Sequence, residues 1–525
     1  MLDQLVGRGV RSDEPDRFDQ LRELSDGTQV IVLANREPFT HERDGNGRIV
    51  VTRSASGVVN AVEPLVASCG GVWVAHGSGS ADLETVTRRD GLDVPPDAPR
   101  YRLRRVWLRE DEEQGYYYGF ANEALWPLCH RAHVRPIFRS NDLETYWRVN
   151  GRFAEAVCEE ATSETPIILV QDYHFALAPL IIRDRLPLST IVTFWHVPWP
   201  QWQTFEICPW RQQILEGLLG SSIIGFQTED DCQNFVETVE HTLEARIDRD
   251  GRSLTRGGRR VLVRAYPASV RWTDASPTPK GARAQRALRA EATREAVCHQ
   301  LGLDSRVQLG VGVDRLDYTK GIEEKFLAVE RLLECYPEFV ERFVFVQLAE
   351  PSRVRLPAYA DLRGRVLAAA ERVNRRFGHV DYCPIVLLEG HHAAPEVERF
   401  LRAADLCFVG SLHDGMNLVS KEFVRARDDE RGVLVLSAFT GAARELTDAL
   451  QINPYDVDGA AAAIAAALLM PVEEQQGRMR RLRAAVAGFD AHRWGAQILS
   501  DAARLQRQVV ERAGVFGLNF GAAAS

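Results

Sequence analysis

The segment DLCFVGSLHDGMNLVSKEFVRAR, residues 405–427, decides the fold class of this chain. It begins with a short apolar run at 405–412, which predicts a buried strand, and it ends in a helical pattern. Gly415 lies in the loop between them, where the backbone can turn. A strand, a loop and a helix start are how α/β proteins present backbone N–H groups and a positive helix end to an anion. The segment therefore predicts an α/β fold with a ligand site at a strand end.

Polar side chains in and near this loop suit a ligand with several parts. Asp414 and Glu422 are too far apart in sequence to act as one carboxylate pair, so we expect them to bind two hydroxyl-bearing parts, such as a sugar and a ribose. About a hundred residues earlier, VDRLDYTKG (313–321) places Arg315 and Lys320 at the end of another predicted strand. Cations of these two kinds fit a diphosphate. Together the two segments predict a site for a nucleotide sugar.

Apolar runs alternate with amphipathic stretches along almost the whole chain. The runs that predict strands lie at 31–35, 167–172, 189–196, 221–227, 307–313, 343–349, 384–390, 405–410 and 432–439. Between two of them, GIEEKFLAVERLLECYP (321–337) shows a helical pattern that ends at Pro337. Near-continuous apolar strands with helices between them are typical of parallel sheets that are covered on both faces.

A stretch biased in Pro, Ala and Arg at 272–297 separates two sets of predicted strands. Its first half predicts a linker and its second half an exposed helix. We therefore expect two doubly wound, Rossmann-like α/β domains that face each other across a cleft, with ligand at the carboxyl ends of their strands. The predicted division is a polar extension (1–26), an N-terminal acceptor domain (27–275), a linker (276–290), a C-terminal nucleotide-sugar domain (291–485), a helix that packs back on the N-terminal domain (486–512) and a loose tail (513–525).

Composition excludes several classes of protein. The 525 residues exceed one ordinary core, and 45% hydrophobic with 26% charged residues is typical of a soluble globular protein. No apolar run approaches the roughly 20 residues of a membrane span, and the N-terminus lacks the apolar core of a secretory signal. The nine scattered cysteines include no C-x-x-C pair, and the net charge is −9. We therefore expect a cytoplasmic protein with reduced thiols, without a metal site, and without a nucleic-acid or membrane partner.

Lysine is rare in this chain, which uses arginine for nearly all of its cations. The only lysines are at positions 280, 320, 325 and 421, and two of them, Lys320 and Lys421, lie in the segments described above. An ammonium group is a compact, strongly hydrated point charge, whereas a guanidinium group is a planar fork. Retained lysines therefore hint at a specific need, although with four positions a chance distribution stays open.

Six motifs occur in an order that is specific when they are taken together. They are VQDYH (170–174), WHVPWP (195–200), GFQTEDD (225–231), DRLDYTKG (314–321), PSR (351–353) and DGMNLVSKE (414–422). With these motifs the chain resembles the trehalose-6-phosphate synthases, retaining glycosyltransferases of family 20 with the two-domain GT-B fold, over roughly residues 30 to 500. The resemblance implies transfer of glucose from UDP-glucose to glucose 6-phosphate through an α,α-1,1 linkage. It implies no cofactor.

The resemblance also implies roles for individual residues. Arg315 and Lys320 would hold the donor diphosphate, Glu422 the ribose, and Asp414 with His196 the transferred glucose. The implied catalytic set is Arg315, Lys320, Asp172 and His196. The remaining implied donor contacts are Gly57, Gly415, Met416, Asn417, Leu418 and Val419. The implied acceptor contacts are Arg36, Tyr117, Trp126 and Arg353 around the phosphate, Trp73 beside the sugar ring and Asp172 at the hydroxyls.

The chemistry explains why such residue types are needed. A departing diphosphate gains charge, and fixed cations aimed at it stabilise the transition state. Retaining glycosidases use a carboxylate nucleophile, whereas the resemblance implies a front-face route in which the departing phosphate oxygen accepts the acceptor's proton. Other interpretations stay open: Arg315 with Asp317 could form a surface ion pair, Asp172 could cap the next turn, and His196 could be structural.

The chain departs from the family pattern at several positions. Ser56-Gly57 stands where two glycines are common, Gln171 where His is common and His413 where Arg is common, and YPASV (266–270) replaces a usual P-V-G. The loop expected at 37–55 is also long. The Ser56-Gly57 change keeps an amino-cyclitol phosphate open as the acceptor. Glycerol 3-phosphate and an amino sugar phosphate are further alternatives, although Arg353 with Tyr117 and Trp126 favours a hexose 6-phosphate over glycerol 3-phosphate. A non-catalytic paralogue that senses sugar phosphates is a further alternative.

Some properties stay open at this point. The nucleotide of the donor could be UDP, GDP or ADP. The sequence is also compatible with a homo-oligomer. The sequence offers no segment beyond about 510 for a phosphatase domain, so we expect a phosphorylated product. The pair His391-His392 lies in a predicted loop, and we expect no metal there.

Overall fold

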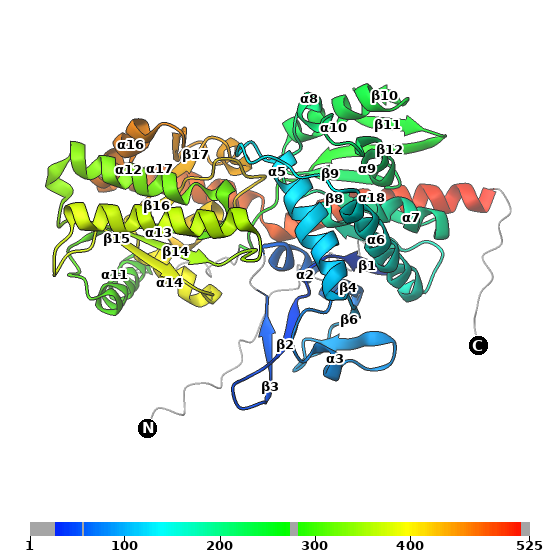
Figure 1. Ribbon diagram of the computed structural model, residues 1–525, viewed down its shortest axis with the longest axis horizontal. Helices are drawn as coiled ribbons and strands as arrows, with labels where there is room; N and C mark the ends of the chain where they lie inside the picture. Colours follow the sequence, from blue (N-terminus) through cyan, green and yellow to red (C-terminus); the bar gives the residue numbers. More distant parts are fainter. Residues whose placement is uncertain (1–26, 55–56, 273–281, 516–525) are drawn as a thin grey trace.

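The computed structural model describes residues 27–54, 57–272 and 282–515 (Figure 1). The predicted extension 1–26, Ser56, part of the predicted linker and most of the predicted tail lie outside the described residues. Within those ranges, no helix combines the length and the apolar character that crossing a membrane requires.

The N-terminal half is built on a ten-stranded sheet. In spatial order its strands are β10 (Arg246–Asp248), β11 (Ser253–Arg256), β12 (Arg259–Ala265), β9 (Ile223–Phe226), β8 (Thr190–Phe194), β7 (Ile167–Gln171), β1 (Val30–Leu33), β4 (Val72–His76), β6 (Tyr101–Val106) and β5 (Gly91–Val94). The strands from β12 to β6 are parallel, and antiparallel strands lie only at the two edges. This arrangement is the parallel sheet that the apolar runs predict.

The C-terminal half holds a six-stranded parallel sheet. Its spatial order is β15 (Ile385–Glu389), β14 (Phe343–Glu350), β13 (Gln308–Arg315), β16 (Leu406–Val409), β17 (Val433–Ser437) and β18 (Leu450–Ile452). All nine predicted strands are present in the two sheets, and the predicted α/β class with two Rossmann-like domains is confirmed.

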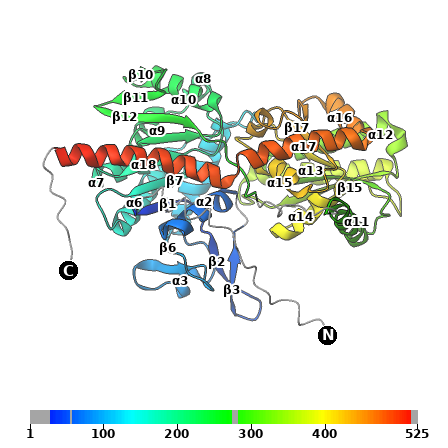
Figure 2. The ribbon, with the colours of Figure 1, turned by 180° about the vertical axis from the view of Figure 1, so that it is seen from behind.

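Alternating side chains of the strands supply two apolar faces. In β1, Val30 and Val32 pack with α2 (Gly57–Cys69) and α18 (Ala491–Val515), whereas Ile31 packs with α6 (Ser140–Glu160) on the other face. Figures 1 and 2 show α6 on one side of the sheet and α18 on the other. Because both faces are covered, the central strands β1, β7, β8 and β9 are apolar along most of their length.

Helices also cover both faces of the C-terminal sheet. On one side lie α12 (Ile322–Cys335), α13 (Pro357–Phe377) and α16 (Val457–Leu469); on the other lie α11 (Ala282–Leu301), α14 (Ala394–Ala403), α15 (Leu418–Ala426) and α17 (Val472–Gly488). The chain then returns, because α18 packs against α2, β7 and β8 of the N-terminal half (Figure 2). The exact domain boundaries given above stay a prediction.

The remaining helices connect these elements. They are α3 (Asp82–Thr85), η1 (Arg88–Asp90), α4 (Glu110–Glu113), the π-helix η2 (Gln114–Leu125), α5 (Trp126–Cys129), η3 (Tyr173–Phe175), α7 (Ala178–Arg185), α8 (Trp202–Phe205), α9 (Arg211–Leu218), α10 (Glu229–Thr242), η4 (Tyr318–Lys320), η5 (Pro337–Phe339) and η6 (Gly441–Arg444). π-Helices are rare in proteins, and those that occur are often found at functional sites.

One antiparallel hairpin replaces a predicted loop. Strands β2 (Phe39–Arg43) and β3 (Ile49–Arg53) pair with each other and project from the N-terminal sheet (Figure 1). The expectation of a long loop at 37–55 is therefore wrong. The turn residues DGNG at 44–47 are typical of a hairpin, and β-branched residues follow them in β3.

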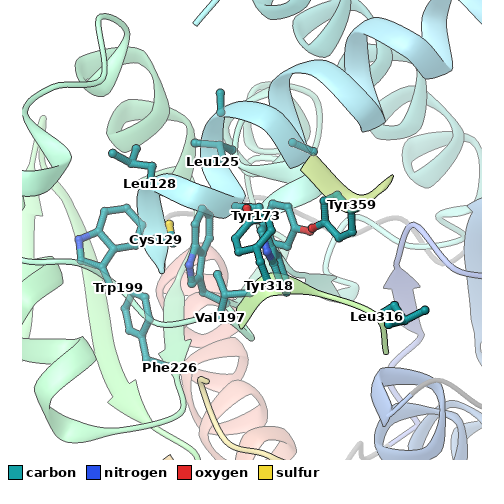
Figure 3. Close-up of a cluster of buried hydrophobic side chains, with 14 of the residues drawn as sticks. Leu125, Leu128, Cys129, Tyr173, Val197, Trp199, Phe226, Leu316, Tyr318 and Tyr359 are labelled. Carbon is teal, nitrogen blue, oxygen red and sulfur yellow. The ribbon is translucent and has the colours of Figure 1, made fainter. Parts of the chain in front are cut away.

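The two halves share buried apolar contacts. Figure 3 shows Tyr173 of the N-terminal half beside Tyr318 and Tyr359 of the C-terminal half, within one continuous cluster of buried side chains. The relative position of the two sheets in this structure is therefore fixed by packing as well as by the connecting chain.

Candidate functional site

A cleft of about 610 Å³ lies between the two halves at the carboxyl ends of their parallel strands. This is where open α/β sheets bind ligands. Fifteen of the predicted site residues line it: Arg36, Gly57, Tyr117, Trp126, Asp172, His196, Arg315, Lys320, Arg353, Asp414, Met416, Asn417, Leu418, Val419 and Glu422. Trp73 and Gly415 are not among the residues that line the cleft.

Trp73 lies in the core of the N-terminal sheet. It belongs to β4, its side chain is 0% exposed, and its indole N–H donates a hydrogen bond of 3.1 Å to the backbone carbonyl of Arg36. The expectation that Trp73 lies beside an acceptor sugar ring is therefore corrected. A central strand covered on both faces buries its aromatic side chains whichever way they point.

Gly415 is needed for close approach rather than for a turn. A Cβ atom at this position would lie 2.3 Å from the carbonyl oxygen of His196, which no side chain tolerates. The left-handed residue of the loop is Asn417, with φ 76°, and its side chain caps α15 by accepting a 3.1 Å hydrogen bond from the N–H of Ser420. The loop therefore packs tightly against the end of β8 before the helix begins.

An ion pair connects the two donor-side segments. Lys320 Nζ lies 2.5 Å from Asp414 Oδ2, and the Asn417 amide donates to the same oxygen at 3.2 Å. Burial alone would raise the pKa of Asp414, but the charge of Lys320 lowers it, so the carboxylate is ionised. The segments at 313–321 and 405–427 therefore meet at one point, as the sequence predicts.

Arg315 lies at the end of β13 and points to the cleft. Among the described residues it forms no ion pair, and its guanidinium carbon lies 5.6 Å from the centre of the Trp126 ring. Asp317 pairs instead with Arg353, at 2.8 Å. The alternative in which Arg315 and Asp317 form a surface pair is therefore not what the structure contains, and Arg315 is a cation available to a ligand.

Arg353 is held by groups from both halves. Its guanidinium stacks on Trp126, donates to Asp317 and to the Tyr359 hydroxyl, and reaches the Tyr173 hydroxyl at 3.1 Å. Its φ of 47° is uncommon for a residue with a side chain. Backbone strain of this kind is found at ligand-binding positions that the surrounding structure enforces.

Three buried nitrogen atoms at this corner have no hydrogen-bond partner among the described residues. They are Trp126 Nε1, His174 Nε2 and Arg353 Nε, and all three residues line the cleft. An unpaired buried donor is unfavourable by about 1–3 kcal/mol. The corner therefore has the composition of a site for an acceptor-rich, anionic group.

The pKa of the Tyr117 hydroxyl is lowered by the positive charge of the same corner. Burial would raise the pKa of Tyr117, but the positive charges of Arg353, Arg36 and Arg315 lower it. His174 stacks on the Tyr117 ring, with 5.7 Å between centroids. Three arginines from both halves thus surround one phenol, which indicates a focused positive potential.

Asp172 combines backbone strain with a shifted pKa. Its φ of 73° and ψ of 172° lie in a region that is nearly restricted to glycine, and its Oδ1 accepts the N–H groups of Tyr173 (3.0 Å) and His196 (3.2 Å). Burial raises its pKa to about 7. The capping interpretation of Asp172 is thus correct for Oδ1, while the residue still lines the cleft.

His196 is neutral and oriented by Gln171. Its Nε2 lies 2.9 Å from the Gln171 side-chain oxygen, and burial lowers its pKa to about 3. Gln171 is one of the departures from the family pattern. A second departure, His413, accepts a 3.1 Å hydrogen bond from the backbone N–H of Arg131, so it joins the two halves.

The lysines within the described residues all form ion pairs. Besides Lys320, Lys325 pairs with Asp314 below the cleft, and Lys421 bonds both Glu445 (3.0 Å) and the carbonyl of Ala268 (2.8 Å). Lys421 is almost completely buried and does not line the cleft. Of the two lysines that the sequence singles out, only Lys320 lines the cleft, and Lys421 is a contact between the two halves.

Sequence reasoning missed several residues that line the cleft. His174 belongs to the VQDYH motif, so its motif was the available signal. Thr40, Thr52 and Arg53 come from the β2–β3 hairpin, which was expected to be a loop. Within the described residues no group of three or more His, Cys, Asp or Glu could hold a metal ion.

Comparisons with known proteins agree with this geometry. The profile of Glycosyltransferase family 20 matches residues 28–504. A protein named trehalose-6-phosphate synthase from Mycobacterium sp. (strain KMS) is 38% identical over 482 residues, which cover 90% of this chain and 95% of that protein. A protein of the same name from Mycolicibacterium smegmatis is 37% identical and is covered to 92%, with 91% of this chain matched.

Solved structures give the same result. The E. coli protein bound with UDP-2-fluoro glucose superposes with a TM-score of 0.75 at 29% identity, covering 91% of this chain and 99% of that one. An alpha,alpha-trehalose-phosphate synthase (UDP-forming) from Burkholderia xenovorans in complex with glucose-6-phosphate has a TM-score of 0.76 at 30% identity, covering 90% and 100% of the two chains.

Proposed function

This chain belongs to glycosyltransferase family 20, and we propose that it transfers glucose with retention from UDP-glucose to glucose 6-phosphate, forming α,α-trehalose 6-phosphate. The observation that carries the proposal is the corner of unpartnered donors. Trp126, His174 and Arg353 each present a buried nitrogen without a partner among the described residues, beside the cations of Arg36 and Arg315. A phosphate supplies the oxygen atoms that the N–H groups of Trp126 and Arg353 lack, and it would also bond His174 in the tautomer that carries its proton on Nε2.

The donor would occupy the C-terminal side of the cleft. Arg315 and Lys320 would neutralise the diphosphate as the glycosidic bond breaks, which is the contribution expected to be largest. Glu422 would bind the ribose hydroxyls. Gly57 would approach the donor from the N-terminal half. It already lies close to the donor-side segment, since a Cβ at position 57 would lie only 3.1 Å from the Leu418 side chain.

The acceptor would occupy the corner between π-helix η2 and Arg353. Charge-assisted hydrogen bonds to a phosphate contribute about 1.5–3 kcal/mol each, so several such donors discriminate strongly against an unphosphorylated sugar. Asp172 would receive a sugar hydroxyl at the oxygen that the backbone N–H groups leave free. Phosphorylation is therefore the property of the acceptor for which the site is best suited.

The reaction would proceed without a protein nucleophile. The bond between the glucosyl anomeric carbon and the diphosphate oxygen breaks, and a bond to the acceptor hydroxyl oxygen forms on the same face. The acceptor's proton passes to the departing phosphate oxygen, whose charge Arg315 and Lys320 stabilise. Asp172 and neutral His196 would orient the two sugars, since one carboxylate oxygen is already occupied by two N–H groups.

A panel of donors and acceptors tests this function. Purified protein is incubated with UDP-, GDP- or ADP-glucose and with glucose 6-phosphate, glucose, glycerol 3-phosphate or an amino sugar phosphate, and released nucleotide is measured. We expect the largest kcat/KM for UDP-glucose with glucose 6-phosphate, and an α,α linkage by NMR. A β-linked product, a preference for another phosphorylated acceptor, or no nucleotide release with any pair would each contradict the proposal.

A further inference from the structure

A buried cluster of charged side chains lies directly behind the turn that carries Arg36 into the cleft. Glu37, the next residue, is 2% exposed, and its Oε2 accepts a 2.8 Å hydrogen bond from Arg105 Nε. Its Oε1 accepts the backbone N–H of Ser78 at 2.9 Å. The side chain of Glu37 therefore points away from the cleft, into the sheet, and it is fixed there.

Arg105 is bonded through all three of its nitrogen atoms. Besides Glu37, it donates from Nη1 to the Asp82 carbonyl (3.0 Å) and to Thr85 Oγ1 (2.9 Å). Its Nη2 reaches the Phe39 carbonyl (3.1 Å) and lies 2.7 Å from Asp82 Oδ1. This fully buried guanidinium thus joins β6, α3 and the base of the β2–β3 hairpin to the residue that follows Arg36.

The backbone of the turn is held from its other side as well. The Trp73 indole N–H donates to the Arg36 carbonyl at 3.1 Å, and the Tyr116 hydroxyl donates to the Asn35 side chain at 2.9 Å. Residues 35, 36 and 37 are therefore each anchored by a buried group. The Arg36 side chain lines the cleft and forms no ion pair among the described residues.

We propose that Trp73, Glu37 and Arg105 are positioning residues that hold Arg36 toward the phosphate of the acceptor. The proposal rests on the proposed function, because Arg36 is assigned to the acceptor phosphate. A long side chain binds better when its backbone is fixed beforehand, since less freedom is lost on binding. The competing explanation is that the cluster only stabilises the base of the β2–β3 hairpin. In that case the effect of substitutions in the cluster on the acceptor KM would not depend on Arg36.

A double-mutant cycle separates these explanations. Trp73→Phe removes one N–H donor while keeping an aromatic ring in the core. We expect it to raise the KM for glucose 6-phosphate about tenfold, the effect of one lost hydrogen bond, with the KM for UDP-glucose within about twofold of the wild type. In the Arg36→Ala background the same substitution should have no further effect on the acceptor KM.

A matched control accounts for loss of stability alone. Trp494 in α18 is also almost completely buried, and its indole N–H donates to the Tyr266 carbonyl at the same distance of 3.1 Å. Trp494→Phe should lower the melting temperature to a similar extent and leave the acceptor KM unchanged. Glu37→Gln, which keeps the size of the side chain but replaces one of its two acceptor oxygens by an NH2 group, serves as a second variant in the same cycle.

Two outcomes would overturn the inference. One is that Trp73→Phe and Glu37→Gln each raise the acceptor KM by the same factor in the Arg36→Ala background as in the wild type. The other is that these substitutions raise the KM values of the acceptor and of UDP-glucose by the same factor. If the wild type uses a different phosphorylated acceptor, the cycle is measured with that compound, and only the acceptor assignment fails. If the wild type binds neither glucose 6-phosphate nor inorganic phosphate by calorimetry, the proposed function and the inference fail together.

Discussion

Arg353 and Trp126 stack across the cleft, with 4.0 Å between the guanidinium carbon and the centre of the indole ring. One residue belongs to the C-terminal half and the other to the N-terminal half, so the acceptor corner is complete only when the two halves meet. Because the Tyr173 hydroxyl also receives a hydrogen bond from Arg353, the guanidinium is held at a defined position. Loss of Arg353 should therefore affect the acceptor selectively.

Arg353→Ala should raise the KM for glucose 6-phosphate by about 10- to 100-fold, because a charge-assisted donor to phosphate contributes about 1.5–3 kcal/mol. Activity with unphosphorylated glucose should be nearly unchanged. Arg355→Ala is the matched control, since Arg355 is exposed, lies 3.7 Å from Glu110 and does not line the cleft. An equal loss with both acceptors would remove Arg353 from the phosphate site.

Arg315→Ala should lower kcat by about 10²–10³, because a fixed cation at the departing diphosphate acts mainly in the transition state. Steady-state nucleotide release measures the rate, and circular dichroism checks that the variant is folded. Arg306→Ala, at an exposed pair with Asp304, is the control for loss of a positive charge from the same half. A folded Arg315→Ala protein with a nearly normal kcat would refute the role.

The sequence predicts strands well where apolar runs are continuous, and it fails where charge enters a strand. β6 reads YRLRRV, and its arginines conceal a strand that lies next to the edge of the sheet, because contacts with Glu37 and Asp82 allow Arg105 to be buried. The β2–β3 hairpin was missed for a related reason. β2 reads FTHER, in which polar and charged residues predominate, and the apolar residues of β3 (IVVTR) are all exposed, so the hairpin contains no buried apolar run.

The motifs predicted most of the site because each follows a strand of a parallel sheet, and the carboxyl ends of such strands meet at one edge. Trp73 could not be placed in this way. A tryptophan within VWVAH gives no signal of whether its ring faces ligand or core, and only the sheet order, with β4 between β1 and β6, decides it. The hydrogen-bond partners of Arg353 are separated from it by up to 180 residues.

The kcat/KM for the acceptor should rise with pH through about 7 if ionised Asp172 binds the acceptor. Burial raises the pKa of this carboxyl to about 7, so it is protonated below that pH and ionised above it. His196 cannot produce this change, because its pKa of about 3 keeps it neutral. Asp172→Asn should lower kcat/KM and remove the acidic limb. Persistence of the limb in that variant would assign it to another group.

The contribution of Glu37 to the stability of the protein should fall as pH rises from about 4.5 to about 8. Burial, and then its hydrogen bond with Asp82, raise the pKa of Glu37 from 4.5 to about 8, and the positive charge of Arg105 offsets this rise only in part. A group whose pKa is higher in the folded state contributes stability below its unfolded pKa and loses that contribution as pH rises through the folded value.

Glu37→Gln carries a permanently neutral side chain of the same size, so its melting temperature should decline less between pH 6 and pH 9 than that of the wild type. Thermal unfolding followed by circular dichroism at unit steps of pH measures both slopes. Glu84→Gln, at an exposed pair with Arg43, should keep the wild-type slope. If Glu37→Gln and the wild type declined in parallel, Glu37 would be ionised throughout, and Arg105 would be balancing two full negative charges in the core.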